Sequence, residues 1–247
     1  MNTLIHRLPF TRRAAAKVRP VLPETIDAQP AIDAHPALEA RSPEAGHAVH
    51  APDAAVLHLD QLMGPDAWAR LPAAVRRRFD AHAAAVCYRG RMDLRCSRLG
   101  RLLAWLAWPL RGPLLPHCAK DVAAEVTVSA DGQGGVVWSR HMGRRTVQSV
   151  KRAHPEHGVL ERTRGGLAMA LDVFEDQGAL VFQSRHYLWC LGPVRLRLPD
   201  WLSPGCCRVE HRDLGDGRFR FTLTMTHPRW GLTFEQTGDF VDPVQEC

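Results

Sequence analysis

Residues 218–226 read Arg-Phe-Arg-Phe-Thr-Leu-Thr-Met-Thr, so apolar and polar side chains alternate with a period of two. Trp230, Leu232 and Phe234 repeat the alternation after a short turn. Because successive side chains of a strand point to opposite faces, the pattern predicts antiparallel strands with one buried and one solvated face. The crossover helices of a nucleotide-binding α/β enzyme have a different period, so that class of enzyme is disfavoured.

The same alternation extends through the second half of the chain. Residues that tolerate positive φ, such as Gly165-Gly166 and Gly215-Asp-Gly217, separate the alternating runs. Strands joined by such short turns form either a curved antiparallel meander or a barrel-like sheet. The predicted strands lie near residues 84–94, 121–129, 135–142, 145–152, 157–163, 167–174, 178–190, 193–198, 206–213, 217–227 and 230–240.

Helical patterns occur only in the first half of the chain. Apolar residues between Leu57 and Phe79 predict two short helices separated at Gly64-Pro65, the second with Pro72 as a first-turn proline. A further apolar helix is predicted over Leu99–Leu110, where prolines end it. The predicted fold class is therefore α+β and mostly β, with N-terminal helices and one helix that covers the sheet.

The helix over Leu99–Leu110 has two interpretations. Trp105 and Trp108 are its largest side chains, and arginines flank it at both ends. Residues 97–111 could therefore make a peripheral membrane contact, with the tryptophans at headgroup depth. We favour the alternative, in which the helix packs on the curved sheet and the tryptophans fill core volume.

The chain divides by composition into three parts. Residues 1–55 are rich in Ala, Pro, His and Glu without hydrophobic periodicity, which predicts a disordered tail. Residues 56–243 form the predicted single β-rich domain, and residues 244–247 a short C-terminal tail.

Charge and cysteine content narrow the functional classes. The formal charge is +6, but residues 1–20 hold five basic and no acidic residues, so the rest of the chain carries only +1. This distribution disfavours specific nucleic-acid binding by the folded part. The seven cysteines are irregularly spaced and form a poor disulfide framework. Without an apolar membrane span or a secretory signal, we expect a cytoplasmic protein.

Several motifs together resemble a bacterial family of unknown function, DUF4166. The resemblance runs from about Leu57 to Pro243, and the family occurs alone or fused to reductase-like domains. It implies a β-rich domain but no established activity. One position departs from the family pattern: a histidine is expected where this chain has Phe79, so a chemical role of that histidine would be missing here. The matching motifs are Leu62–Arg76, Tyr88–Met92, Trp138 with Arg140, Ser149, Leu160-Glu-Arg162, Gly217–Phe221 and the His227–Gly231 turn.

A polar anchor inside the sheet is the strongest candidate site. Trp138 and Arg140 share one face of a strand, which places the guanidinium inside. A buried guanidinium needs a partner, and we expect Glu161 to supply it, with Ser149 completing the hydrogen bonding. Such an anchor at the base of an apolar pocket, lined also by Trp230, could hold a carboxylate or hydroxyl group. The alternative is a structural ion pair that fixes strand register.

Motifs for catalysis or metal binding are weak. His154-Pro-Glu-His157 is the nearest approach to a metal site, but its hairpin-like, hydrophilic sequence favours a solvated loop. No Gly-x-Ser-x-Gly, zinc-ligand spacing or phosphate-binding glycine loop occurs. We therefore predict no catalytic residues, no metal and no cofactor, and lean against an enzyme.

Three functional hypotheses follow. The leading one is a soluble module that binds a hydrophobic or lipid-like small molecule in a cavity behind the sheet, because bulky inward residues surround few polar groups. The second is a structural or interaction domain with a solid core and an unidentified protein partner. The third, an enzyme or an accessory to a reductase-like partner, rests only on the family resemblance. The sequence decides neither the ligand nor the oligomeric state.

Overall fold

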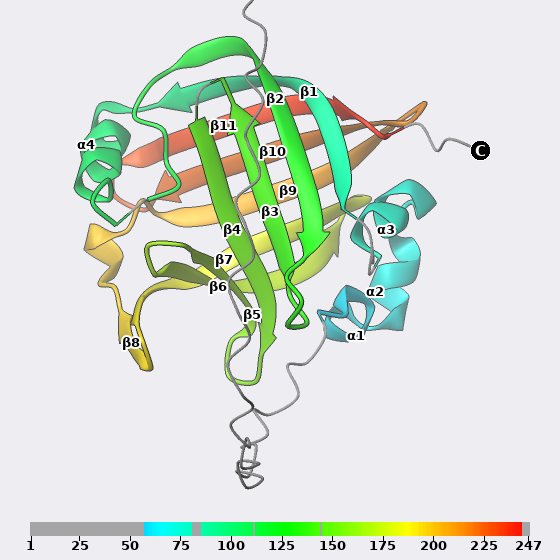
Figure 1. Ribbon diagram of the computed structural model, residues 1–247, viewed down its shortest axis with the longest axis horizontal. Coiled ribbons are helices and arrows are strands. Elements are labelled where there is room, and N and C mark those ends of the chain that lie inside the picture. Colours follow the sequence, from blue (N-terminus) through cyan, green and yellow to red (C-terminus); the bar gives the residue numbers. More distant parts are fainter. Residues whose placement is uncertain (1–56, 81–84, 111, 144, 244–247) are drawn as a thin grey trace, which may run out of the picture. The chain divides into compact units, whose positions relative to one another are not determined.

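The computed structural model describes residues 57–80, 85–110, 112–143 and 145–243, and antiparallel strands make up most of this part (Figure 1). Each predicted strand is present, with ends that differ by no more than two residues from the prediction. The predicted tails, residues 1–55 and 244–247, lie outside the described residues. The strands are β1 (Val86–Cys96), β2 (Ala119–Ala130), β3 (Val136–Met142), β4 (Arg145–His154), β5 (Gly158–Thr163), β6 (Leu167–Asp176), β7 (Ala179–Leu191), β8 (Val194–Arg197), β9 (Cys206–Gly215), β10 (Arg218–His227) and β11 (Gly231–Val241).

The sheet closes into a barrel. The strand order is β6-β5-β4-β3-β2-β1-β11-β10-β9-β7-β8, and a further pairing of β6 with β7 joins the two sides. Ten strands therefore form a ring, to which β8 is added as an extra strand on β7. Of the two architectures that the alternation allowed, the structure adopts the closed one, in which each ring strand pairs with a strand on both sides over at least part of its length.

Strand β7 changes its partner along its length. Residues 179–183 pair with β9, whereas residues 188–191 pair with β8. Between these stretches, side chains bridge β7 to the β9 side: the Cys207 amide donates to Ser184 Oγ at 2.8 Å, and the Tyr187 hydroxyl donates to the Gly205 carbonyl at 2.8 Å. The seam between β7 and β9 is thus held by main-chain bonds in one half and by side-chain contacts in the other.

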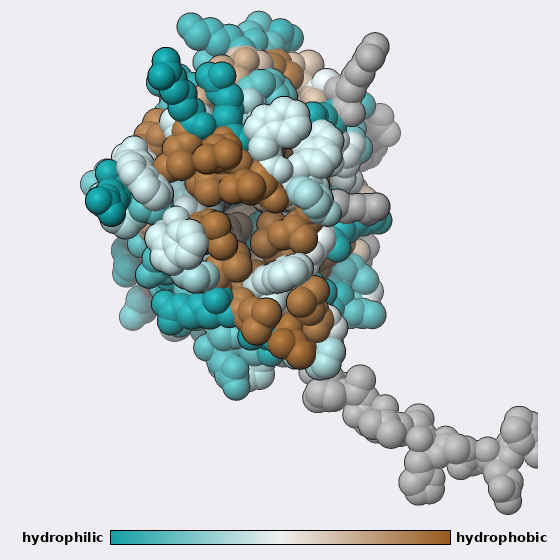
Figure 2. All heavy atoms as spheres, turned by 90° about the vertical axis from the view of Figure 1, so that its left-hand side faces the viewer, coloured by the Kyte–Doolittle hydropathy of each residue, from teal (hydrophilic) through white to brown (hydrophobic). Residues whose placement is uncertain are grey.

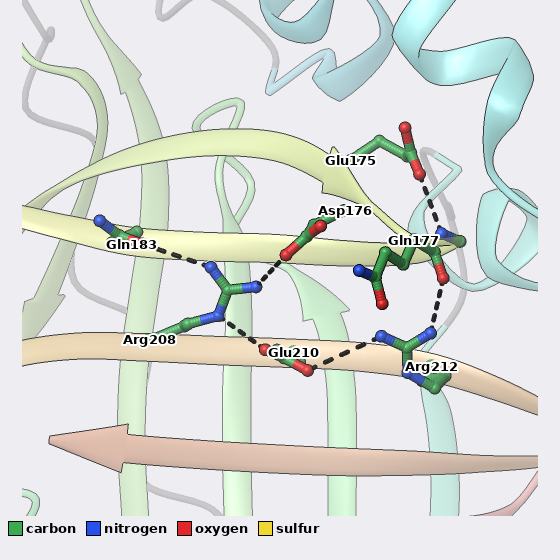
Figure 3. A network of polar contacts seen from close by, with 8 residues as sticks. Glu175, Asp176, Gln177, Gln183, Arg208, Glu210 and Arg212 are labelled. Carbon is green, nitrogen blue, oxygen red and sulfur yellow. Dashed lines mark hydrogen bonds and ion pairs between the residues drawn. The ribbon is translucent and has the colours of Figure 1, made fainter.

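A polar network on the outside of the barrel links β9 to β6 and β7, in the part of the seam where β7 and β9 share main-chain hydrogen bonds. Arg208 Nη2 donates to Asp176 Oδ2 at 2.5 Å and Arg208 Nε to Glu210 Oε1 at 2.6 Å (Figure 3). Arg212 Nη1 donates to the Gln177 carbonyl oxygen at 2.6 Å, so both arginines of β9 reach the β6–β7 turn (Figure 3). Partly exposed pairs of this kind contribute little stability, about 0–1 kcal/mol each, but they fix the position of the turn.

Helices lie at the two ends of the barrel. At one end are α1 (Leu59–Met63), α2 (Pro65–Arg70) and α3 (Ala73–Phe79), three short helices where two were predicted (Figure 1). At the other end is α4 (Arg98–Leu106), near the 3-10 turn η1 (Asp200–Leu202) (Figure 1). The barrel ends thus have different covers, and the candidate site lies at the α4 end.

Helix α4 is shorter than predicted and packs on the barrel through its small residues. Ser97 caps it by accepting a hydrogen bond from the Gly100 amide at 3.1 Å. Gly100 and Ala104 are the buried residues, and a Cβ added at Gly100 would lie only 2.3 Å from the Thr233 carbonyl oxygen of β11. Trp105 is 63% exposed and Trp108 50% exposed, so the expectation that they fill core volume was wrong.

A β-bulge in β11 explains a second difference from the sequence pattern. Phe219, Phe221, Leu223 and Met225 of β10 are buried as their alternation predicts. In β11, Met225 pairs with Phe234 but Thr226 pairs with Leu232, so Thr233 is the extra residue of the bulge. Because the extra residue breaks the alternation, Leu232, which precedes it, is exposed instead of buried. Trp230 lies in the turn before β11 and is also exposed.

Candidate functional site

A cavity of about 300 Å³ opens at the α4 end of the barrel. Residues of α4, several barrel strands and the segment 198–204 line it, and Figure 2 looks onto the hollow between them. Its volume is at the lower end of the range for small-molecule sites. The apolar part of the lining includes Leu103, Leu106, Leu114, Met169, Trp189, Phe221, Leu223 and Met225.

The polar part of the cavity is built on β4 and β5. Ser149 and Lys151 are two residues apart on β4 and both are buried, which is the period of a strand face. Lys151 is paired with Glu161 in the β4–β5 register, and its Nζ lies 3.1 Å from Glu161 Oε2. Ser149 Oγ donates to Glu161 Oε1 at 2.6 Å. The carboxylate therefore has a charged partner and a hydroxyl partner inside the barrel.

Arg140 does not form the predicted ion pair with Glu161. It lies on β3, where it pairs with Val147 of β4, whereas Lys151 stands directly opposite Glu161. Because directly opposed side chains are the nearest neighbours of a sheet, the lysine takes the carboxylate. Arg140 lines the cavity, and its Nε has no hydrogen-bond partner among the described residues.

The electrostatics leave one uncompensated positive charge at this end of the cavity. Burial disfavours ionisation of Glu161, but the charges of Lys151 and Arg140 and the Ser149 hydrogen bond outweigh it and lower its pKa. Burial also lowers the pKa of Lys151, and its attraction to Glu161 opposes that shift. With Lys151 and Glu161 forming a neutral pair, the Arg140 guanidinium supplies a net charge of about +1.

Aromatic side chains separate the cavity from the α3 end of the barrel. Phe79 of α3 lies with its ring centroid 5.6 Å from that of Trp138 and 4.7 Å from that of His211. Burial, followed by the charges of Lys151, Arg78 and Arg140, holds the pKa of His211 well below its ordinary value. The imidazole is therefore neutral near pH 7 and packs as part of the aromatic cluster. Phe79 occupies the position at which the family resemblance implies a histidine.

Four of the five predicted site residues line the same cavity: Trp138, Arg140, Ser149 and Glu161. The fifth, Trp230, is 49% exposed and stacks on His227 with 4.1 Å between ring centroids, and it is not part of the lining. The difference arises because Trp230 lies in the turn between β10 and β11 and not in the strand that was predicted to begin there. Sequence reasoning missed Lys151, although its place two residues after Ser149 put it on the same strand face. It also missed His211 and Trp189, whose Nε1 has no hydrogen-bond partner among the described residues.

Two potential nucleophiles are not activated for chemistry: the Tyr187 hydroxyl, which lines the cavity, and the Cys207 thiol, which is fully buried and is not part of the lining. Burial is the main reason that the pKa of Cys207 rises to about 12, so its thiol stays protonated at neutral pH. Burial likewise raises the pKa of Tyr187, whose hydroxyl is engaged by the Gly205 carbonyl. Since a nucleophilic cysteine acts as the thiolate, neither group is prepared for covalent catalysis.

A separate group of possible metal ligands lies in the β4–β5 turn. Ligand atoms of His154, Glu156 and His157 lie within 4.8 Å of one another. His154 Nδ1 already accepts the Glu156 amide at 3.2 Å, and burial and the charge of Arg195 lower the pKa of this histidine. The positive charge of Arg195 disfavours a bound metal cation for the same reason that it disfavours protonation of His154. The hydrogen bond from the Glu156 amide to His154 is sufficient to explain the arrangement of the turn.

The fold and cavity define a class of protein: a closed antiparallel β-barrel with an apolar interior space and a charged group at its base. In the described part of the chain, no helix has the length and apolar character needed to cross a membrane. The model of the family described as a domain of unknown function, DUF4166, matches residues 71–240, and the chain belongs to this family. A comparison with curated proteins gives no match.

Proposed function

We propose that this barrel binds a small amphipathic molecule, with its apolar body against the cavity lining and an anionic headgroup at Arg140. The observation that carries the proposal is the Arg140 guanidinium, a charged donor without a partner at Nε among the described residues, beside the Lys151–Glu161 pair in a mostly apolar cavity. Burial of an unpartnered charge is unfavourable, so a ligand acceptor at this position relieves a cost that the free protein carries. A carboxylate matches the fork of guanidinium donors.

The cavity volume limits the ligand size. Since a water molecule takes up roughly 30 Å³, a space of about 300 Å³ holds about ten groups of that size. A carboxylic acid with about ten carbons therefore fits, and a longer chain would extend through the mouth beside α4. The proposal is one of binding without chemistry, because the phenol that lines the cavity, that of Tyr187, is protonated and hydrogen-bonded rather than nucleophilic.

Decanoic acid and decanol provide the test, because they differ mainly in the headgroup. Titration calorimetry with the folded protein should give one binding site for the acid, and saturation should raise the melting temperature since only the folded state has the cavity. Arg140→Met should weaken the acid by about tenfold or more, the loss of one charge-assisted hydrogen bond, and leave the alcohol within about twofold.

Arg162→Met is the matched control. Arg162 neighbours Glu161 in sequence but is exposed on the other face of β5, so the same loss of charge should leave acid binding unchanged. Absence of binding by either compound, together with no ligand released from gently purified protein in native mass spectrometry, would exclude the cavity ligand. The interaction-domain hypothesis would then take its place.

A further inference from the structure

Exposed apolar side chains concentrate around the cavity mouth. Nine of the thirteen exposed large apolar residues in the described part of the chain belong to residues 102–108 and 191–202. These two segments are far apart in sequence, yet Leu106 and Leu202 line the same cavity. Figure 2 shows apolar side chains on both sides of the hollow. We call the six most exposed of them the apolar rim: Leu102, Trp105, Leu106, Trp108, Val194 and Trp201.

Helix α4 presents its large side chains to the outside. Leu102, Trp105 and Leu106 follow the i, i+3, i+4 spacing of one helix face, and all three are more than half exposed. The opposite face, with Gly100 and Ala104, is the one that packs on the barrel. A helix that only covered a core would bury its bulky residues, so this orientation indicates that something outside the barrel contacts the exposed face.

Positive charge accompanies the apolar rim. Arg98 and Arg101 of α4 and Arg195 and Arg197 of β8 are exposed, while Asp200 is the sole acidic residue in the described residues 97–110 and 191–202. Four positive charges and one negative charge give these segments a net +3. Tryptophan and leucine beside arginine is the composition of helices that lie in the interface of an anionic bilayer.

We propose that the face around the cavity mouth docks on an anionic phospholipid bilayer. In this arrangement α4 and η1 lie in the interface, and Trp105 and Trp201 sit at headgroup depth. The four arginines contact lipid phosphates, and the mouth opens toward the acyl chains. The charge argues against a second copy of this chain as the partner of this face, because a dimer through it would bring together two faces that each carry a net charge of +3.

Docking itself does not depend on the cavity ligand, since it rests on exposed side chains. The role of docking does rest on the proposed function. A cavity mouth that faces the acyl chains would let an amphipathic acid pass between bilayer and cavity without crossing water. The two ideas can therefore fail separately. Decanoate binding measured without vesicles tests the cavity, and vesicle binding measured without decanoate tests the rim.

The experiment uses the full chain and vesicles of phosphatidylcholine with 30 mol% phosphatidylglycerol, compared with pure phosphatidylcholine. We expect the protein to cosediment with the anionic vesicles only, and the bound fraction to be larger at low salt than at high salt. The double variant Trp105→Ser/Trp201→Ser should reduce partitioning at least tenfold while keeping the melting temperature and decanoate binding, because neither tryptophan lines the cavity. Trp230→Ser, which removes a half-exposed tryptophan outside the apolar rim, is the control and should bind vesicles normally.

The basic residues 1–20 could also attract anionic lipid, and fluorescence quenching distinguishes vesicle binding through them from vesicle binding through the apolar rim. Lipids brominated along the acyl chain should quench the tryptophan fluorescence of the Trp230→Ser protein. They should quench the double variant much less, because Trp108 is the only tryptophan of the apolar rim that it keeps. The proposal is overturned if the wild type ignores anionic vesicles, or if the double variant binds and is quenched like the wild type. It is also overturned if light scattering shows a dimer that the double substitution dissociates, because a second copy then occupies the rim.

Discussion

Lys151 and Glu161 stand directly opposite each other across β4 and β5, with Nζ 3.1 Å from Oε2 and both side chains almost fully buried. The Ser149 hydroxyl donates to the second carboxylate oxygen. Such a pair costs desolvation energy when it forms, and removal of one partner leaves the other charge buried and uncompensated.

Breaking this pair should therefore be strongly destabilising. Lys151→Met or Glu161→Gln alone should lower the free energy of unfolding by about 3–5 kcal/mol, and the double variant should lose much less than the sum. Urea denaturation of the four proteins measures the coupling. Additive effects of under about 1 kcal/mol each would show that both groups are solvated.

Arg140 should behave in the opposite way. Its Nε lacks a partner among the described residues, so Arg140→Met removes a charge that the free protein does not compensate. We expect the free energy of unfolding to change by less than about 1 kcal/mol in either direction, while decanoate affinity falls. A loss as large as that of Lys151→Met would mean that Arg140 has a structural partner, and would contradict its role as a ligand anchor.

His211 should make the protein sensitive to acid. Its pKa in the folded state lies well below the ordinary 6.5, so below pH 6.5 the unfolded chain binds a proton that the folded chain does not. Stability should fall as pH drops through this range, with a contribution approaching about 1.4 kcal/mol per pH unit until the folded pKa is reached. His211→Phe should remove this component between pH 6.5 and 5, as seen in paired urea titrations. An unchanged slope would show that other groups cause the acid sensitivity.

Gly100 should be required for the seating of α4. A Cβ there would lie 2.3 Å from the Thr233 carbonyl oxygen, so Gly100→Ala should destabilise the protein even though alanine favours a helix by about 1 kcal/mol. Arg101→Ala, on the exposed side of the same helix, is the control and should be close to neutral. Thermal melts of both variants give the comparison. A stabilised Gly100→Ala protein would mean that α4 is not held against β11.

The sequence predicted the strands well because period two depends only on which face of each strand is buried. It located the turns because glycine marks positive φ, as at Gly166, where φ is 85°. It could not predict the bulge at Thr233, since nothing in the alternation distinguishes an extra residue from a regular one. Leu232 was therefore assigned to the wrong face, and Trp230 lies in the turn before the strand.

The site was predicted in composition but not in pairing. Trp138, Arg140, Ser149 and Glu161 all line the cavity, because inward direction follows from alternation within each strand. Which cation meets Glu161 depends on strand order and register, and the sequence alone fixes neither. The size of the cavity was equally out of reach, because it depends on ring closure through β6 and β7.

The divided pairing of β7 has a kinetic consequence. Near residues 179–183 the wall is a continuous ladder, and widening it there would break several main-chain hydrogen bonds at once. Beside the cavity the wall depends on single side-chain contacts, among them the bond from the Tyr187 hydroxyl to Gly205. The two ends of the barrel therefore differ in the number of main-chain hydrogen bonds that must break before β7 and β9 separate. For the ligand that we propose, Tyr187→Phe should change the residence time in the cavity without altering the ladder that keeps the ring closed.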